Sequence, residues 1–333
     1  MNTKNFTFSI LELATVCSHS TPQETFKKSL DLAQKAEGFG YKRFWLAEHH
    51  NMLSIASSAT SVLIGYIAGG TKTIRVGSGG IMLPNHSPLI VSEQFGTLAS
   101  IYPNRIDLGL GRAPGTDPIT AQAIRSDRMQ AVHKFPEEIS EIQKYFSSEN
   151  SGGKVRASVA EGINVPLYIL GSSTDSAHLA AKKGLPYVFA SHFAPAQLFE
   201  ALNIYRSNFK PSEFLQEPYT IACINVIAAD SDQQAETIST SMIRMMFGVL
   251  TGNIDYLQAP INMTRELRDL SEDPAFQRML KYSFVGSKET VKQKTADFLQ
   301  KTGVNELMVA SHIYDHQDRV KSYRIFSEVM KEF

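Results

Sequence analysis

Short apolar runs alternate with longer segments of helical character along most of the chain. In three places a helical segment ends at a glycine (Gly40, Gly184 or Gly303), and a short apolar run follows within a few residues. Glycine suits the left-handed position just beyond a helix, so the pattern predicts repeated units of helix and strand. Eight runs are expected to be strands: residues 6–14, 43–48, 74–83, 105–110, 166–170, 187–191, 219–229 and 306–311.

The predicted strands are nearly continuous in apolar character, which is typical of strands buried on both faces of a parallel sheet. Strands that alternate with helices are joined by right-handed crossovers. Eight such units close naturally into a (β/α)8 barrel, the TIM-barrel class of α/β fold. The length of 333 residues agrees with one barrel domain over residues 1–333, because such barrels often exceed about 250 residues around a single core.

Two segments do not fit the repeat. Residues 147–164 are rich in Ser, Gly and charged side chains, and residues 250–282 are too long for a simple connection. We interpret both as insertions in the barrel. Long loops in a compact domain are often functional, so the second is a candidate lid over the barrel mouth, and a solvated excursion is the alternative.

The helix predicted over residues 56–68 has almost no charged face. Val62 and Tyr66 belong to one apolar side, while Ile64 and Ala68 extend the apolar character to the other. A helix that is apolar all round needs cover on both sides, and the outer helix of a barrel is covered by its own barrel on one side. We therefore predict a homodimer with an interface at helix 56–68.

The composition restricts the ligands and the compartment. Lys and Arg together number 33 and are balanced by 33 Asp and Glu, which argues against nucleic acid or a membrane surface as a partner and favours small ligands. No apolar stretch approaches the roughly 18 residues of a membrane span. Cys17 and Cys223 stand far apart and indicate neither a disulfide framework nor a zinc site. A cytoplasmic protein is expected.

The first candidate cluster follows the second strand, because barrel active sites form at the C-terminal ends of strands. Glu48, His49 and His50 stand there in a row, where acid and base groups reach a central ligand. Adjacent side chains on a strand point to opposite faces, so one histidine at most is expected to face inward. This weakens a metal site of paired histidines, and ordinary polar plugs remain the alternative.

Glycines cluster at the end of the third strand, where Gly79 and Gly80 are adjacent. Clustered glycine in a strand indicates close approach of a ligand or a tight corner. The fourth strand continues into residues 107–115, which superficially suggest a dinucleotide-binding motif. Pro114 stands where the third glycine of that motif belongs, so a Rossmann site is not predicted. Arg112 remains a candidate for binding phosphate, with a salt bridge as the alternative.

Small and hydroxyl residues crowd the end of the fifth strand, and a helix is expected to begin there. The free N–H groups and the positive end of the dipole at a helix start favour anions. Capping alone needs one hydroxyl residue, whereas here Ser172, Ser173 and Ser176 follow Gly171. We therefore predict a phosphate site.

Four motifs together resemble the bacterial-luciferase-like flavin-dependent monooxygenases: residues 45–50 (WLAEHH), 79–84 (GGIMLP), 103–112 (PNRIDLGLGR) and 170–173 (LGSS). Their order and spacing are those of the family, and the resemblance covers nearly the whole chain. It implies the same barrel that the repeats predict.

The resemblance also implies roles for single residues. His49 matches a histidine that supports the chemistry of flavin with oxygen, and Glu48 would orient that neighbourhood. Gly79 and Gly80 match a pair joined by a cis peptide bond beside the flavin ring. Arg125 competes with Arg128 for the role of a second phosphate-binding arginine. The positions matched to the flavin phosphate site are Arg112, Arg128, Ser172, Ser173 and Ser176. Gly171, where luciferase has another residue, is also expected to bind the cofactor.

The function implied by the resemblance is oxygenation of an aldehyde or similar small organic molecule with reduced FMN (FMNH2) and O2. Because the chain has no nicotinamide motif, a separate NAD(P)H-dependent flavin reductase is expected to supply FMNH2. One alternative is a deazaflavin-dependent oxidoreductase on the same barrel, against which the residues Glu48, His49 and His50 argue. Another is a non-catalytic flavin-binding protein, against which His49 and Arg112 argue.

Overall fold

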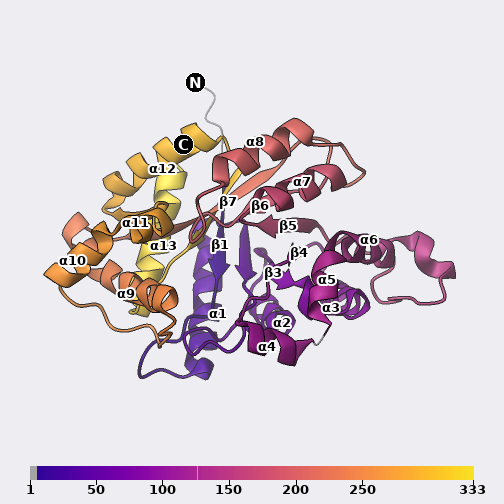
Figure 1. Ribbon diagram of the computed structural model, residues 1–333, viewed down its shortest axis with the longest axis horizontal. Coiled ribbons are helices and arrows are strands. Elements are labelled where there is room, and N and C mark those ends of the chain that lie inside the picture. Colours follow the sequence, from indigo (N-terminus) through magenta and orange to yellow (C-terminus); the bar gives the residue numbers. More distant parts are fainter. Residues whose placement is uncertain (1–5, 126) are drawn as a thin grey trace.

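The predicted strands follow one another in the expected order and are separated by helices (Figure 1). The computed structural model describes residues 6–125 and 127–333, without the side chains of residues 128 and 129. The strands are β1 (Thr7–Glu12), β2 (Arg43–Leu46), β3 (Arg75–Met82), β4 (Ile106–Gly111), β5 (Leu167–Gly171), β6 (Tyr187–Phe189), β7 (Thr220–Ala228), β8 (Ser283–Gly286) and β9 (Glu306–Ala310).

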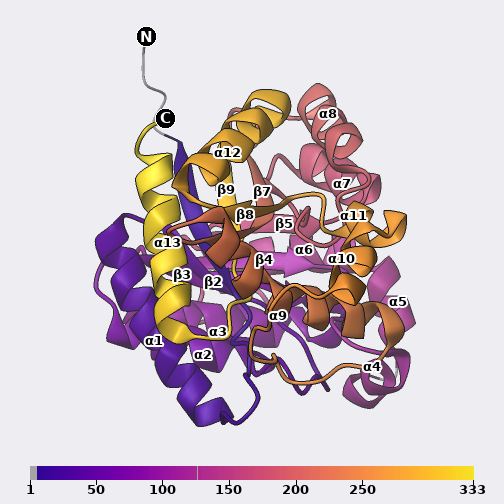
Figure 2. The same cartoon turned by 90° about the vertical axis from the view of Figure 1, so that its left-hand side faces the viewer.

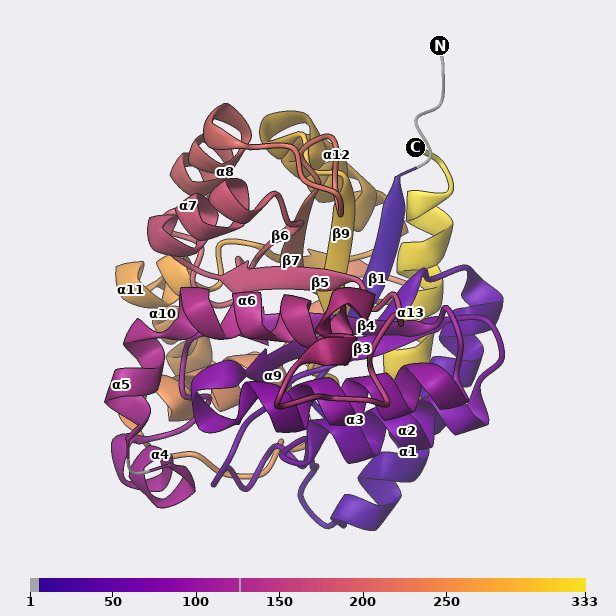
Figure 3. The ribbon, with the colours of Figure 1, turned by 90° about the vertical axis from the view of Figure 1, so that its right-hand side faces the viewer.

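The helices lie around the outside of the strands (Figure 2, Figure 3). They are α1 (Pro22–Phe39), α2 (Thr60–Gly70), α3 (Pro88–Ile101), α4 (Pro118–Ile124), α5 (Arg128–His133), α6 (Phe135–Phe146), α7 (Thr174–Lys183), α8 (Leu198–Asn208), α9 (Asp232–Thr251), α10 (Arg265–Glu272), α11 (Pro274–Met279), α12 (Lys288–Thr302) and α13 (His316–Met330). Two short 3-10 helices are η1 (Leu83–Asn85) and η2 (Ser148–Gly152).

Eight parallel strands close into a barrel, which confirms the predicted fold. The strands β1 to β7 pair in sequence order, each with the next. The ring is closed by β9, which pairs with both β7 and β1. The ring closes where Tyr187 lies opposite Thr220 and where Thr7 lies opposite Glu306. All eight predicted strands are present in this ring.

The ninth strand, β8, was not expected from the sequence. It pairs with the C-terminal part of β7, from Asn225 opposite Ser283 to Ala228 opposite Gly286, while β6 pairs with the first residues of β7. Its four residues contain Phe284 and Val285 as the only large apolar side chains. A run that short produces no recognisable period, so pairing with β7 decides its conformation.

The helix ends follow the predicted glycine stops. Gly40, Gly184 and Gly303 follow α1, α7 and α12, with φ values of 93°, 61° and 57°. Their N–H groups bond back to carbonyls of the last helical turn. These positive φ values are favourable for glycine because it has no Cβ. Each stop sets the direction in which the next strand enters the barrel.

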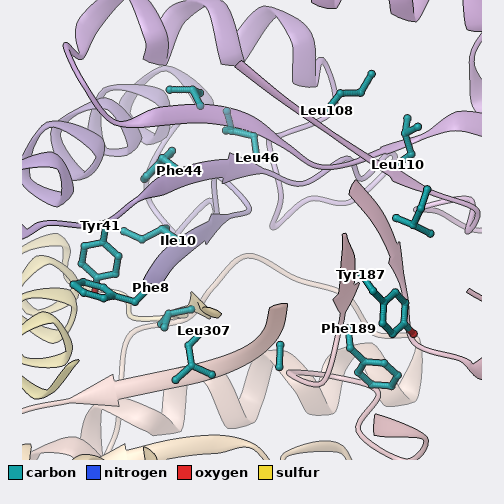
Figure 4. Packing of buried hydrophobic residues seen from close by; sticks show 14 of the residues in the cluster. Phe8, Ile10, Tyr41, Phe44, Leu46, Leu108, Leu110, Tyr187, Phe189 and Leu307 are labelled. Atoms are coloured by element: carbon teal, nitrogen blue, oxygen red, sulfur yellow. The ribbon is translucent and has the colours of Figure 1, made fainter. Parts of the chain in front are cut away.

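Alternate residues of each strand divide the apolar core in two. Phe8, Ile10, Phe44, Leu46 and Leu307 belong to the cluster that packs against the helices (Figure 4). Their neighbours in the sequence face the barrel interior and form a separate cluster, which includes Leu11, Trp45 and Met308. This division is the period-two pattern of a strand that is covered on both faces.

The N-terminal end of the barrel is filled by a buried ionic network. Arg43 donates to Glu306 at 2.9 Å and to Asp107 at 2.9 Å, and its guanidinium also bonds to the Tyr168 hydroxyl. Trp45 adds a hydrogen bond to Asp107 at 3.0 Å. Burial is tolerated because each charge has charged or hydrogen-bonding partners. The network plugs the end of the barrel opposite to the C-terminal strand ends.

The predicted helix 56–68 corresponds to α2, which begins at Thr60, so the expected start was wrong. The backbone before it pairs with another segment: Ile55 bridges to Thr15, and the Ala56 N–H donates to the Ala14 carbonyl. Those bonds keep the preceding residues out of the helix. Val62 is 69% exposed and Tyr66 is 43% exposed, so one apolar side of α2 faces outward.

The two segments that depart from the repeat have short elements of their own. Residues 147–164 contain η2, and residues 250–282 contain α10 and α11, which lie against each other and near α9 (Figure 1). Leu257 joins the second segment to the residues that follow β1, because its N–H donates to the Val16 carbonyl and its carbonyl accepts from the Ser18 N–H. Across the described residues, no helix combines the length and apolar character needed to cross a membrane.

Candidate active site

A cavity of about 460 Å³ lies at the C-terminal ends of the barrel strands. This volume falls in the usual range for small-molecule and cofactor sites. The cavity brings together predicted site residues that are far apart in the sequence: His49, Gly79, Arg112, Gly171, Ser172, Ser173 and Ser176. Apolar side chains supply most of the remaining wall, including Leu11, Leu13 and Met82.

His49 faces this cavity, whereas its neighbour His50 does not. The His50 Nε2 instead lies 2.9 Å from the Glu48 Oε1. The opposite orientation of the two histidines agrees with the prediction that one of them at most would face inward. Burial lowers the pKa of His49, and the Gly115 backbone and Glu48 only partly offset this effect. His49 is therefore a neutral imidazole at neutral pH.

Glu48 is fully buried but does not line the cavity. Its carboxylate lies 2.9 Å from the Nε2 of both His50 and His86, and it accepts from Asn85 Nδ2 and the Met82 N–H. Burial raises the pKa of Glu48, but these hydrogen bonds outweigh it and lower the pKa to about 2. Glu48 thus links the end of β2 to the end of β3 and to η1. Because it does not line the cavity, it influences the cavity by holding these neighbouring residues in place.

The peptide bond between Gly79 and Gly80 is cis, as the resemblance predicted. Gly79 lines the cavity, and Gly80 lies beside β4. A Cβ on Gly79 would approach Leu11 Cδ1 to 2.6 Å, and one on Gly80 would approach the Gly109 carbonyl oxygen to 2.7 Å. Packing against the β4 backbone therefore requires glycine at position 80, whereas a Cβ at position 79 would displace the end of the Leu11 side chain. As glycine, residue 79 leaves bare backbone on the cavity wall.

The helix start after β5 offers hydrogen-bond donors to the same cavity. Ser173 is the N-cap of α7, but its side chain makes no capping hydrogen bond. The Ser176 hydroxyl donates to the Ser173 carbonyl at 2.7 Å and also lies 3.0 Å from the Tyr187 hydroxyl. A Cβ on Gly171 would overlap Ser176. Ser176 therefore shapes this helix start, while Ser172 and Ser173 carry the hydroxyls at its tip.

The arginines near this helix start have different surroundings. Arg112 lines the cavity and pairs with Asp175 in the first turn of α7 at 3.3 Å. Arg125 donates to the His86 carbonyl at 2.7 Å and pairs with Asp127, and it does not line the cavity. The side chain of Arg128, the other predicted phosphate-binding arginine, lies outside the described part of the structure.

Several wall residues were not identified from the sequence. His192 and Phe193 follow β6 and line the cavity, as do Pro114 and Gly115 after β4 and Val132 in α5. His192 directly follows a predicted strand, so the rule for polar residues at strand ends would have found it. The candidate lid at residues 250–282 contributes no described residue to the cavity wall. Residues 112–115, which follow β4, do line it.

Metal binding has no support from the described side chains. Within residues 6–125 and 127–333, no group of three or more His, Cys, Asp or Glu side chains is placed to bind a metal ion. The donors that reach the cavity are an arginine, serine hydroxyls and imidazoles. This set suits an organic ligand with an anionic group.

Comparison with known proteins gives the family. The model of luciferase-like monooxygenases matches residues 6–306. The chain belongs to the luciferase-like monooxygenase family. It is accordingly an enzyme of the monooxygenase type. A luciferase-like monooxygenase of Escherichia coli strain K12 is 48% identical over 332 residues, covering 100% of this chain and 99% of the relative.

Solved structures of related proteins share the barrel. Apo-MsnO8 matches this luciferase-like monooxygenase with a TM-score of 0.89 and 32% identity over 98% of both chains. The oxygenating constituent of 3,6-diketocamphane monooxygenase of Pseudomonas putida, in complex with FMN, has a TM-score of 0.74, 17% identity and 98% and 97% coverage. An F420-dependent secondary alcohol dehydrogenase has a TM-score of 0.69, 16% identity and 98% coverage of both chains. These two likenesses concern the fold.

Proposed function

We propose that this luciferase-like monooxygenase uses reduced FMN and O2 to oxygenate a small organic molecule such as an aldehyde or a related carbonyl compound. The observation that carries the proposal is that one cavity collects His49, Gly79, Arg112 and the serine-rich start of α7. These groups come from the ends of four strands, and each has a use in binding a phosphorylated flavin. The FMN complex solved on the same barrel supports this choice of cofactor.

The residues present fit FMN. Arg112, Ser172, Ser173 and the first N–H groups of α7 would hold the phosphate, because guanidinium, hydroxyl and helix-start donors all favour phosphate oxygens. The bare backbone at Gly79 would accept the flat ring. When bound, reduced FMN supplies the electrons that activate oxygen.

His49 is the group of this chain that we assign to proton handling beside the flavin ring. A neutral imidazole has one nitrogen that accepts a proton and one that donates it, and burial favours that neutral form. Glu48 does not touch the cavity, so we assign it a positioning role. Its bonds to His50, His86 and the Met82 N–H fix the backbone on either side of the wall that carries His49.

Exclusion of water is assigned to the wall formed after β4. Pro114, Gly115 and Val132 line the cavity together with Met82 and Phe193. An apolar wall keeps water from competing with the substrate and from diverting reduced oxygen species. The barrel supplies the rest of the enclosure.

Two partners belong to the proposal. A separate NAD(P)H-dependent reductase would supply reduced FMN, because the strand carrying Gly109 and Gly111 continues into a loop instead of a phosphate-binding helix. A second copy of the chain would cover the exposed side of α2, which carries Val62 and Tyr66. The pure protein given NADPH and FMN is then expected to turn over very slowly, and rapid oxidation of NADPH without a reductase would contradict the proposal.

The decisive experiment is anaerobic titration with FMNH2 followed by addition of labelled oxygen and a panel of aldehydes and ketones. We expect saturable binding of FMNH2 and a product that carries one atom from the labelled oxygen. A parallel titration with reduced F420 separates the proposal from hydride transfer on the same barrel. Tighter binding of F420, or absence of FMN binding in both redox states, would overturn the proposal. FMN binding without oxygenation of any panel member would instead indicate a non-catalytic binding protein.

A further inference from the structure

His192 occupies a distinctive place in the cavity. It follows β6, and His49 follows β2. In the ring β1–β2–β3–β4–β5–β6–β7–β9, these two strands lie four places apart in either direction. The two histidines therefore reach the same cavity from opposite sides of the barrel.

The backbone around His192 is held rigidly by buried polar side chains. Asn225 of β7 donates to the His192 carbonyl at 2.6 Å, and the hydroxyl of Ser191 donates to the Cys223 carbonyl at 2.6 Å. The Ala194 N–H also closes a turn onto the Ala190 carbonyl at 3.2 Å. A position fixed by its neighbours in this way suits a preorganised binding group.

The imidazole of His192, by contrast, is not held by any hydrogen bond that the described residues provide. Its side chain is buried, and its Nδ1 has no partner among them. His50 and His86 differ, because both are bound to Glu48. The Nδ1 is enclosed, whereas the Nε2 is not among the enclosed unpartnered atoms and makes no hydrogen bond with the described residues. A ligand in the cavity would therefore meet the Nε2, and a hydrogen bond to it would add affinity.

The surroundings of His192 are uncharged. Phe193 packs edge-on against its ring with centroids 4.8 Å apart, and Ala190 adds an apolar neighbour on the wall. Burial lowers the pKa of His192 to about 3, with His312 and His49 adding to this effect. Among the described residues that line the cavity, Arg112 is the one with a formal charge, and we have assigned it to the flavin phosphate.

We propose that His192 is the substrate-binding residue of this site and that its ring hydrogen-bonds the polar group of an uncharged, largely apolar substrate across the barrel from His49. This inference rests on the proposed function for the identity of the cofactor and deepens it by naming the residue that binds the polar group of the substrate. A neutral imidazole both donates and accepts, so it serves a carbonyl or an ether-like oxygen. Leu11, Leu13 and Met82 offer apolar wall for the rest of such a molecule. A carboxylate or ammonium substrate would lose its hydration with no opposite charge left to pair it.

The test uses the full chain saturated with FMN and titrates it by calorimetry with three probes of equal chain length: 2-octanone, octanoate and octylammonium. The first variant is His192→Phe, which keeps a ring but removes both nitrogens. The other two, His192→Asn and His192→Gln, supply an amide group on a shorter and a longer side chain. His312→Phe is the matched control. His312 is also a buried histidine whose Nδ1 has no described partner, but it does not line the cavity.

We expect 2-octanone to bind and the two charged probes to bind at least about tenfold more weakly. His192→Phe should weaken the ketone about tenfold, which corresponds to the loss of one hydrogen bond, and leave FMN affinity unchanged. At least one of the two amide variants should recover most of the ketone affinity. His312→Phe should not change it.

The inference is overturned if His192→Phe binds the ketone as tightly as the parent does, or if the ketone does not bind to the parent at all. It is also overturned if octanoate or octylammonium binds with the same affinity as the ketone. A fourth contrary result is an equal loss of ketone affinity and FMN affinity in all three His192 variants. The last result would make His192 a structural residue. Absence of FMN binding to the parent chain would contradict the proposed function separately. In that case the ketone titration without FMN still tests His192.

Discussion

The carboxylate of Glu48 and the imidazole Nε2 of His86 lie 2.9 Å apart and connect the end of β2 to the 3-10 turn that follows β3. The same carboxylate is hydrogen-bonded to the His50 ring and accepts a hydrogen bond from the Met82 N–H. The arrangement makes Glu48 the centre of the wall behind His49 without placing it in the cavity. It also makes the wall sensitive to the charge of this one group.

Replacing Glu48 should therefore cost stability in a pH-dependent way. The pKa of Glu48 in the folded protein is about 2, against an ordinary value of 4.5. A lowered pKa stabilises the fold above pH 4.5, and the contribution disappears as the pH falls toward 2. We expect Glu48→Gln to lower the free energy of unfolding at pH 7 by about 3 kcal/mol, measured by urea denaturation.

The difference between Glu48→Gln and the parent should shrink as the pH drops from 4.5 to 2. Glu24→Gln is the control, because Glu24 also has a lowered pKa but is fully exposed on α1. It should alter stability much less. A constant difference across the pH range would show that the charge of Glu48 does not stabilise the wall.

Arg112 should distinguish FMN from riboflavin, which lacks the phosphate. Losing a charge-assisted hydrogen bond costs about 1.5–3 kcal/mol, so Arg112→Ala should weaken FMN binding roughly 10- to 100-fold. Riboflavin affinity should stay the same in a fluorescence titration. Asp175→Asn should strengthen FMN binding, because Asp175 pairs with Arg112 at 3.3 Å. Equal losses for both flavins would contradict the phosphate assignment.

Gly171 should tolerate no side chain, because a Cβ there would overlap Ser176 at the start of α7. We expect Gly171→Ala to destabilise the protein by about 1–3 kcal/mol and to weaken FMN binding. The double variant Gly171→Ala/Ser176→Gly removes the overlap and should recover part of both losses. Gly152→Ala is the control, because a Cβ at Gly152 would meet nothing within 4 Å. A harmless Gly171→Ala would refute the packing argument.

His49 should control oxygenation more than flavin binding. Removing a proton-handling group commonly lowers a rate 10²- to 10⁴-fold, so His49→Ala should reduce product formation by at least about 100-fold with FMN still bound. Burial lowers the pKa of His49 from its ordinary 6.5. Its neutral form therefore persists below pH 6.5, and the acid limb of the pH–rate profile should lie below that value. An acid limb above pH 6.5 would argue against neutral His49 as the active form.

The exposed side of α2 should determine the oligomeric state. Placing a charge in an apolar interface is unfavourable, so Val62→Glu should convert a dimer to a monomer in sedimentation experiments at micromolar concentration. Phe214→Glu is a control, because Phe214 is also exposed but lies in the loop before β7. A monomeric parent protein, or a dimeric Val62→Glu, would exclude α2 as the interface.

The chain's own pattern determined the barrel. Strands buried on both faces have to be apolar along their length, and helices have to end where glycine allows the left-handed turn. The apolar run around Phe44 therefore indicates a buried strand, and Gly40 indicates the end of the helix before it, from local sequence alone. The rule that side chains alternate along a strand likewise indicated that His49 and His50 would point apart. These features depend on a few consecutive residues, so they can be derived without the tertiary structure.

Only the tertiary structure decided which distant groups meet. The short strand β8 exists because β7 offers it a partner, and α2 begins at Thr60 because the preceding residues pair with the exit of β1. The partners of Glu48 come from two stretches, residue 50 and residues 82–86, and His192 faces His49 because closing the ring sets β6 across from β2. Such contacts depend on how the ring closes, and no local pattern contains that information.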